Sequence, residues 1–353
     1  LFLGNAVQSE LYKNNGNGTF SNITESAGFE ISCEKCYIAG ALWLDYDLDG
    51  YLDIFLSDYN QISPNKLYRN LGDETFQQID LTDYIENSNS FSAIPIYAND
   101  DMYPDIYIAN DFDQFNQLLI NQEGQGFIEM AEEYGVVDPF DGMGLTTCDF
   151  NNDLSLDFFV TNIKENSLYT KDTTNNSFAY TNYSEEANLY DTDWAWGVTF
   201  SDFNHDGFED FYVANGFFNP ENDRFFINDS GNNFTYSDFS GNPPLMSKSR
   251  SVNSFDYDND GDLDLIVTDF NLNVNLWENK SVDTYFSESI MGSWVKIFLE
   301  GTVSNRDGLG SIIEINFEDG SSQIRQYSGS GYQHQSIQSI HFGGSVNNNI
   351  SSI

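Results

Sequence analysis

Short apolar runs alternate with polar turns along most of this chain. Gly40-Ala-Leu-Trp-Leu44, Leu52-Asp-Ile-Phe-Leu56 and the segment 67–76 are clear cases. Runs of this length, bounded by turn residues, are typical of β-strands. Asn22–Gly28 and Ile128–Tyr134 are long enough only for single helical turns. We therefore predict an all-β protein with very little helix.

The predicted strands fall into a repeating unit. Asp53, Asp105, Asp157, Asp210 and Asp264 occupy the same place in successive units, at intervals of 52, 52, 53 and 54 residues. A period near fifty is typical of propellers and other repeat arrays. Four short strands per unit is the pattern of a propeller blade. We predict a β-propeller of six or seven four-stranded blades, with seven favoured.

Each unit contains a nine-residue acidic loop that ends at the repeating aspartate. We number these loops 1 to 5 (residues 45–53, 97–105, 149–157, 202–210 and 256–264). In loop 1, Asp45, Asp47 and Asp49 stand at positions 1, 3 and 5, and Gly50 stands at position 6. Carboxylates this crowded repel one another unless a cation lies among them. A glycine with positive φ lets the three side chains converge, and a carbonyl at position 7 and a carboxylate at position 9 complete a calcium shell.

Loops 4 and 5 keep this pattern, whereas loop 3 has Leu154 in place of the glycine and is predicted to bind more weakly. Loop 2 has Tyr97 at position 1 and Met102 at position 6, and we predict that it keeps its shape without an ion. A solvated turn is the alternative for any single loop, but the in-phase recurrence argues against it. Magnesium and zinc suit these ligands less well than calcium. The predicted calcium ligands are Asp45, Asp47, Asp49, Tyr51 and Asp53; Asp149, Asn151, Asp153, Ser155 and Asp157; Asp202, Asn204, Asp206, Phe208 and Asp210; and Asp256, Asp258, Asp260, Asp262 and Asp264.

The formal net charge of −43 excludes nucleic acid and anionic membrane surfaces as partners, because both would be repelled. Apolar residues make up 40% of the 353 positions, which is enough for a large core. No apolar run is long enough to span a bilayer. Millimolar external calcium suits low-affinity sites of this kind, so we expect a secreted or cell-surface protein.

Three cysteines and eight Asn-x-Ser/Thr sequences bear on the compartment. Cys33 and Cys36 are predicted to form a local disulfide, with free thiols or a redox or metal role as alternatives. Cys148 is predicted to be a small buried residue. The Asn-x-Ser/Thr sequences permit glycosylation without demonstrating it: Asn17, Asn22, Asn175, Asn182, Asn228, Asn233, Asn279 and Asn349.

The repeat ends after Asp264, and a different β-rich segment follows. We predict a propeller domain over residues 1–285 and a small β domain over 286–353, with strands at Trp294–Leu299 and Ser311–Phe317. The chain begins in the middle of a repeat, which predicts an incomplete first blade and a further acidic loop upstream. The second domain also stops before it should finish.

The loops and their flanking strands resemble FG-GAP/VCBS repeats. The C-terminal segments Ser304–Ser311, Ser328–Tyr332 and His341–Gly344 resemble an ASPIC/UnbV domain, so the chain resembles the cartilage acidic protein-like family. That resemblance implies an integrin-like propeller that binds calcium in its hairpin loops. The family offers no agreed catalytic residues.

The leading hypothesis for function is a non-enzymatic calcium-binding propeller that serves adhesion or recognises extracellular proteins or glycans through its loops. The alternative is a structural subunit of an extracellular filament or surface assembly, joined by strand addition through Leu1–Leu3. We expect no enzymatic activity, because His205, His334 and His341 form no grouping with a nucleophile. His205 is predicted to be exposed and His341 to be structural.

Overall fold

The computed structural model describes residues 1–4, 9–29, 37–60, 63–81, 84, 88–99, 101–112, 114–171, 178–239, 246–280, 293–344 and 349–353. These residues contain no α-helix, and the segments 24–28 and 131–135 are single turns. The prediction of an all-β protein with scarce helix is confirmed. Cys33 and Cys36, and the predicted domain boundary at residues 285 and 286, lie outside the described residues.

The chain divides into two compact units. The first comprises residues 1–142, 300–310 and 333–335, and the second comprises residues 143–299, 311–332 and 336–353. Within the described part of each unit, most strands form antiparallel sheets of three or four in sequence order, as in propeller blades.

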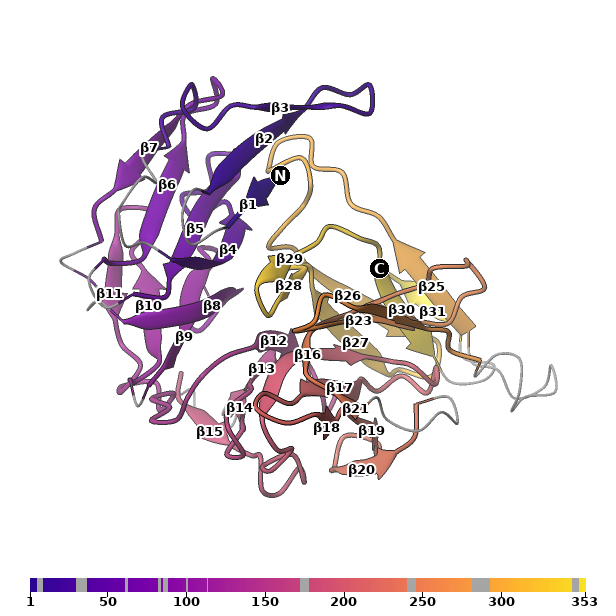
Figure 1. The fold of residues 1–353 in the computed structure, drawn as a ribbon. Helices are drawn as coiled ribbons and strands as arrows, with labels where there is room; N and C mark the ends of the chain where they lie inside the picture. The colour runs from indigo at the N-terminus through magenta and orange to yellow at the C-terminus, as the bar shows by residue number, and fades with distance from the viewer. Residues whose placement is uncertain are drawn as a thin grey trace. The chain divides into compact units, whose positions relative to one another are not determined.

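The first unit contains three such sheets (Figure 1). They are β1 (Phe2–Leu3), β2 (Glu10–Asn14) and β3 (Phe20–Asn22); β4 (Ile38–Leu44), β5 (Asp53–Asp58), β6 (Lys66–Asn70) and β7 (Phe76–Ile79); and β8 (Asn89–Ile96), β9 (Asp105–Asp111), β10 (Gln117–Asn121) and β11 (Phe127–Glu129). The short strand β29 (His334–Gln335) also belongs to this unit.

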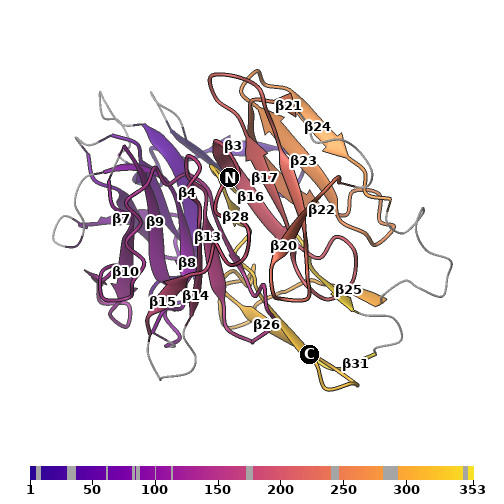
Figure 2. The same cartoon turned by 90° about the horizontal axis from the view of Figure 1, so that it is seen from below.

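The second unit contains three further sheets of the same kind and the C-terminal strands (Figure 2). The blade-like sheets are β12 (Leu145–Cys148), β13 (Asp157–Val160), β14 (Ser167–Lys171) and β15 (Tyr180–Asn182); β16 (Ala195–Ser201), β17 (Asp210–Asn215), β19 (Arg224–Asn228) and β20 (Phe234–Ser237); and β22 (Ser249–Phe255), β23 (Asp264–Asp269) and β24 (Val274–Trp277). The other strands are the pair β18 (Glu221–Asn222) and β21 (Met246–Ser247), the pair β25 (Ser293–Ile297) and β30 (Ile340–Gly344), the sheet β26 (Ile312–Phe317), β27 (Ser322–Gln326) and β31 (Ile350–Ser352), and β28 (Ser330–Gly331).

Apolar clusters between consecutive sheets form the core of each unit. In the first unit, Leu42 of β4 and Phe55 of β5 pack in one cluster with Ile106 of β9. In the second unit, Phe159 of β13 and Phe211 of β17 pack with their ring centroids 4.8 Å apart. Burying whole faces of neighbouring sheets removes these residues from water, which is the main stabilising contribution in such a stack. Cys148 is a free, buried thiol at the end of β12, as predicted.

Candidate metal centres

Each acidic loop joins the first and second strands of its sheet. Loop 1 leaves β4 at Leu44 and enters β5 at Asp53. Position 4 and position 6 both adopt the left-handed conformation in loop 1, where Leu48 has φ 57° and Gly50 has φ 90°. The same pair recurs in loops 3, 4 and 5. Two left-handed residues separated by one are what curls the backbone around the acidic side chains.

In loops 1, 3, 4 and 5 the aspartate at position 1 accepts hydrogen bonds from amides of its own loop. The two carboxylate oxygens of Asp45 accept hydrogen bonds from the amides of Asp49 and Gly50, each at 3.0 Å. Asp202 does the same in loop 4 with Asp206 at 3.1 Å and Gly207 at 2.9 Å. Desolvation raises the pKa of Asp45 to about 6 and that of Asp202 to about 7. A positive charge placed nearby would lower both pKa values and so favour the ionised carboxylates.

Positions 1, 3 and 5 converge in loops 1 and 5. Asp45, Asp47 and Asp49 each present a carboxylate oxygen, and these oxygens all lie within 4.8 Å of one another. Asp256, Asp258 and Asp260 do likewise. In each set one buried oxygen, Oδ1 of Asp47 or of Asp256, has no hydrogen-bond partner among the described residues.

Such convergent oxygens fit a hard divalent cation, and calcium would draw on side chains at positions 1, 3 and 5. In loops 3 and 4 the position 3 ligand is an asparagine that donates to the position 5 carboxylate. Asn151 Nδ2 lies 3.1 Å from Asp153, and Asn204 Nδ2 lies 3.0 Å from Asp206. Leu154 takes the left-handed conformation predicted for it, with φ 65°.

Position 9 has a role that the sequence did not reveal. Asp53 accepts the amide of Tyr46 at 3.1 Å on one oxygen and the amide of Asn70 at 2.7 Å on the other. The carboxylate therefore ties the start of the loop to the third strand of its sheet. Asp105, Asp210 and Asp264 make the same two bonds in loops 2, 4 and 5. We call this arrangement the position 9 clamp.

Loop 3 departs from that arrangement. The amides of Phe150 and Lys171 stabilise the ionised form of Asp157, although neither meets hydrogen-bond geometry. Burial raises the pKa of Asp157 well above its usual range. The third strand of this sheet ends in Lys171, whereas the corresponding residue in the other sheets is an asparagine. The clamp of loop 3 is thus weaker than those of its neighbours.

The asparagine of the third strand also reaches the preceding loop. Asn121 Nδ2 donates to the Tyr46 carbonyl of loop 1 at 2.8 Å. In the second unit, Asn228 donates to Phe150 at 2.8 Å and Asn279 to Phe203 at 2.9 Å. Each accepting carbonyl is at position 2 of a loop. The side chains of Asn228 and Asn279 are buried in these contacts, so they are not available as glycan acceptors.

Positive side chains of the same chain lie beside two of the clusters. Arg69 contacts Asp47 through Nε at 2.6 Å and Asp49 through Nη2 at 3.1 Å. Lys296 of β25 forms an ion pair with Asp256, at position 1 of loop 5. Arg69 and Lys296 therefore neutralise part of the negative charge of these carboxylates, as a bound metal ion would also do.

The C-terminal strands of the second unit pack on loops 4 and 5. His341 of β30 stacks on His205 with ring centroids 5.1 Å apart, and its Nε2 lies 3.0 Å from the Gly261 carbonyl. Arg325 of β27 forms an ion pair with Glu209 at 3.0 Å. His205 is only 5% exposed, so the prediction that it is exposed was wrong. His341, which covers His205, is more than a hundred residues further along the chain.

Loop 2 lacks the position 1 carboxylate. The Tyr97 hydroxyl instead donates to the Gly310 carbonyl at 2.7 Å. Asn99 and Asp101 still bond to each other, with 2.7 Å between Asn99 Nδ2 and Asp101 Oδ2. Met102 is 79% exposed. The clamp of Asp105 persists, so the loop keeps its attachment to the sheet without the full ligand set.

A family model for the FG-GAP-like repeat matches residues 45–108, 149–213 and 202–267. These segments cover just over half of the chain, and the chain belongs to the FG-GAP-like repeat family. Comparison with curated proteins finds no significant match.

Two solved structures are among those similar to this chain. One is a lectin of Agrocybe aegerita that recognises non-reducing terminal N-acetylglucosamine, with 15% identity and a TM-score of 0.44 over 78% of this chain and 76% of the lectin. The other is the biofilm matrix protein Bap1 of V. cholerae, with 9% identity and a TM-score of 0.39 over 88% of this chain and 62% of Bap1. The described residues include no helix that is long and apolar enough to cross a bilayer.

Proposed function

We propose that this chain is a calcium-binding β-propeller domain of a secreted or cell-surface protein. Its role is adhesion or the recognition of extracellular proteins or glycans, without enzymatic activity. The convergence of Asp45, Asp47 and Asp49, with an unsatisfied buried oxygen among them, supports this proposal most directly. External calcium at millimolar concentration matches sites built from so few protein ligands.

Bound calcium would join the turns of each loop to one another and offset the repulsion among its carboxylates. The FG-GAP-like repeats support the propeller part of the proposal, for which we propose six or seven blades, with seven favoured. The segment 286–353 is proposed to be an ASPIC/UnbV-like domain of the kind found in cartilage acidic protein-like proteins. Its packing on loops 4 and 5 connects it to the calcium sites.

The test is a calcium titration of the metal-free protein by calorimetry, together with thermal melts in calcium and in chelator. We expect several ions to bind and the melting temperature to rise with calcium, because ligands that bind only the folded state stabilise it. Magnesium at the same concentration serves as the control and should shift the melt less. Absence of calcium binding at millimolar concentration would contradict the proposal.

A second candidate is a subunit of an extracellular filament or surface assembly. The strand β1 pairs with β2 on one side, and no strand of the described residues pairs with its other edge. An open edge can accept a strand from another molecule. Light scattering at increasing protein concentration separates the two candidates, because a constant monomer mass contradicts assembly by strand addition.

A further inference from the structure

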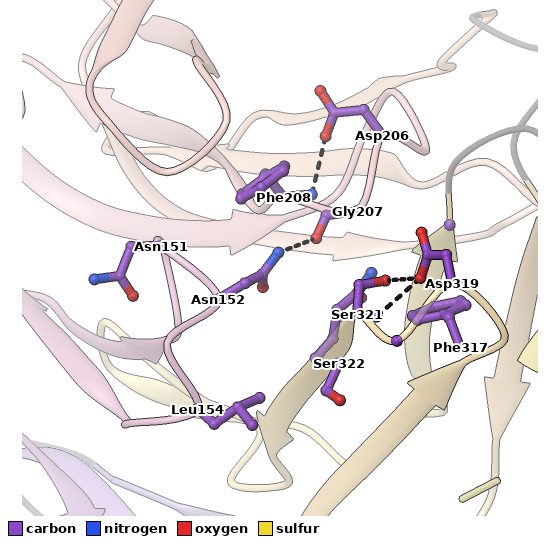
Figure 3. A pocket seen from close by; sticks show the side chains of 13 residues that line it. Asn151, Asn152, Leu154, Asp206, Gly207, Phe208, Phe317, Asp319, Ser321 and Ser322 are labelled. Atoms are coloured by element: carbon purple, nitrogen blue, oxygen red, sulfur yellow. Dashed lines mark hydrogen bonds between the residues drawn. The ribbon is translucent and has the colours of Figure 1, made fainter. Parts of the chain in front are cut away.

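A cavity of about 570 Å³ lies in the second unit, where loops 3 and 4 face the β26–β27 hairpin (Figure 3). Asn152 and Leu154 line it from loop 3, Phe208 lines it from loop 4, and Ser321 and Ser322 line it from the hairpin. Its volume falls within the range of roughly 300–1,000 Å³ that small-molecule sites occupy.

The lining combines hydrogen-bonding groups with apolar surfaces. Asp206 and Asp319 contribute carboxylates, and no lysine, arginine or histidine lines the cavity. The rings of Phe208 and Phe317 provide apolar faces. Asp206 is also a proposed calcium ligand of loop 4, so Asp319 supplies the charge that remains in the cavity when calcium is bound. A ligand with a phosphate, sulfate or carboxylate would be repelled by it. The lining therefore favours a polar ligand without negative charge.

Two buried acceptors of the lining lack a donor. Gln323 is 4% exposed and donates from Nε2 to the Gly343 carbonyl at 2.9 Å, but its Oε1 has no hydrogen-bond partner among the described residues. Asn152 donates to the Gly207 carbonyl at 2.9 Å, and its buried Oδ1 is likewise without a partner there. Leaving such an acceptor unsatisfied costs about 1–3 kcal/mol. Both oxygens are closed off from solvent, so a ligand hydroxyl gains this energy only if the side chain shifts toward the cavity.

We propose that this cavity binds a neutral saccharide, as one or two sugar units of a glycan. Sugar hydroxyl groups donate to the amide oxygens of Asn152 and Gln323 and to the Asp319 carboxylate, and the apolar face of the sugar ring packs on Phe208. The inference rests on the proposed recognition function and names its ligand class and its site. A peptide with a lysine or arginine side chain matches the charge of the lining and can also stack on Phe208, so basic peptides are the competing ligand class in the test.

The experiment uses the full chain in calcium-containing buffer on an array of neutral and acidic glycans and of basic peptides. The best neutral hit is then titrated against wild type, Ser322→Phe and Asn152→Gly. Ser322→Phe fills the cavity with a ring, and we expect at least roughly tenfold weaker binding, the loss that corresponds to about 1.4 kcal/mol. Asn152→Gly removes the amide while glycine retains the φ of 53° found there, and several-fold weaker binding is expected.

Ile312→Phe is the matched control, because Ile312 lies on β26, is 47% exposed and does not line the cavity. The glycan affinity of Ile312→Phe should equal that of wild type. Equal affinity of all four proteins would place recognition elsewhere and overturn this inference while leaving the proposed function intact. A preference for acidic glycans or basic peptides would overturn the ligand class. A protein that binds calcium but no glycan would refute the proposed sugar site without affecting the proposed calcium sites. If Ser322→Phe does not fold, the affinity of Asn152→Gly tests the site instead.

Discussion

Loops 1 and 2 are neighbours in the first unit, and they differ at position 1. The comparison separates the residues proposed to bind the ion from those that attach the loop to its sheet. Loop 1 has Asp45 at position 1, which organises the turn and joins a convergent set of carboxylates. Loop 2 has Tyr97 there, and its hydroxyl points to a different partner. Both loops nevertheless keep the position 9 clamp, through Asp53 and Asp105. We therefore assign positions 1, 3 and 5 to the proposed ion and the clamp to the scaffold.

Among the variants that test this comparison, Asp105→Ala is expected to change the free energy of unfolding the most. It removes the acceptor of two buried amides, those of Ala98 and Asn121, at 2.9 and 2.8 Å. We expect a loss of about 3 kcal/mol in the free energy of unfolding, equal in calcium and in chelator. Denaturant titration measures it, with Glu123→Gln on the exposed surface as control. A loss seen only in calcium would mean that loop 2 holds an ion.

The pH dependence of stability offers the next test. Burial raises the pKa of Asp105 to about 7 in the folded protein, above its ordinary value of 3.8. The folded state therefore binds this proton more tightly than the unfolded state, and the contribution of this group to stability is lost as pH rises from about 4 through 7. Asp105→Asn cannot titrate, so its melting temperature in chelator should fall less over this range. An unchanged slope would contradict the assignment.

Leu154→Gly tests the departure of loop 3 from loop 1. A left-handed leucine costs roughly 1–2 kcal/mol, and glycine recovers this at an entropic cost of roughly 0.5–1 kcal/mol. We expect a net gain of about 0.5–1 kcal/mol in the free energy of unfolding and tighter calcium binding by loop 3. Gly50→Leu in loop 1 is the reciprocal variant and should lose stability. A destabilised Leu154→Gly protein would show that the leucine side chain contributes packing that outweighs its strain.

Arg69→Met is expected to have the smallest effect. It removes the cation beside Asp47 and Asp49, an ion pair that is partly exposed and hence weak. Calcium affinity at loop 1 should increase by up to about fivefold. Lys13→Met is the control, because Lys13 forms an exposed ion pair with Glu74, which is not a predicted calcium ligand. Weaker calcium binding in Arg69→Met would indicate that the guanidinium holds the carboxylates in place for the ion.

Local pattern was enough to predict the strands, the repeat and the carboxylates that converge. The alternation of apolar runs with turns places β4 and β5 around loop 1, and the positive φ of Gly50 follows from its place in the motif. The left-handed Leu48 could not be foreseen, because leucine has no preference for that conformation. The in-phase asparagines, such as Asn121 after Leu119 and Ile120, were a signal that could have revealed the links between sheets.

Long-range packing explains what the sequence did not reveal. The burial of His205 depends on His341, and the ion pair of Asp256 depends on Lys296, both from C-terminal strands. The cavity likewise needs two loops and a hairpin that are far apart in the chain. Periodicity reports which face of a strand is buried, but it does not report which distant strand covers that face.

The calcium stoichiometry of a matched pair of variants tests the central claim most directly. Asp49→Asn and Asp101→Asn each alter position 5, in loops 1 and 2 respectively, and calorimetric titration counts the ions that each protein binds. Asp49→Asn should lose one site relative to wild type or weaken it strongly, and Asp101→Asn should leave the number unchanged. Equal stoichiometry together with unchanged affinity in both variants, or a site lost only in Asp101→Asn, would contradict the assignment of positions 1, 3 and 5 to the ion.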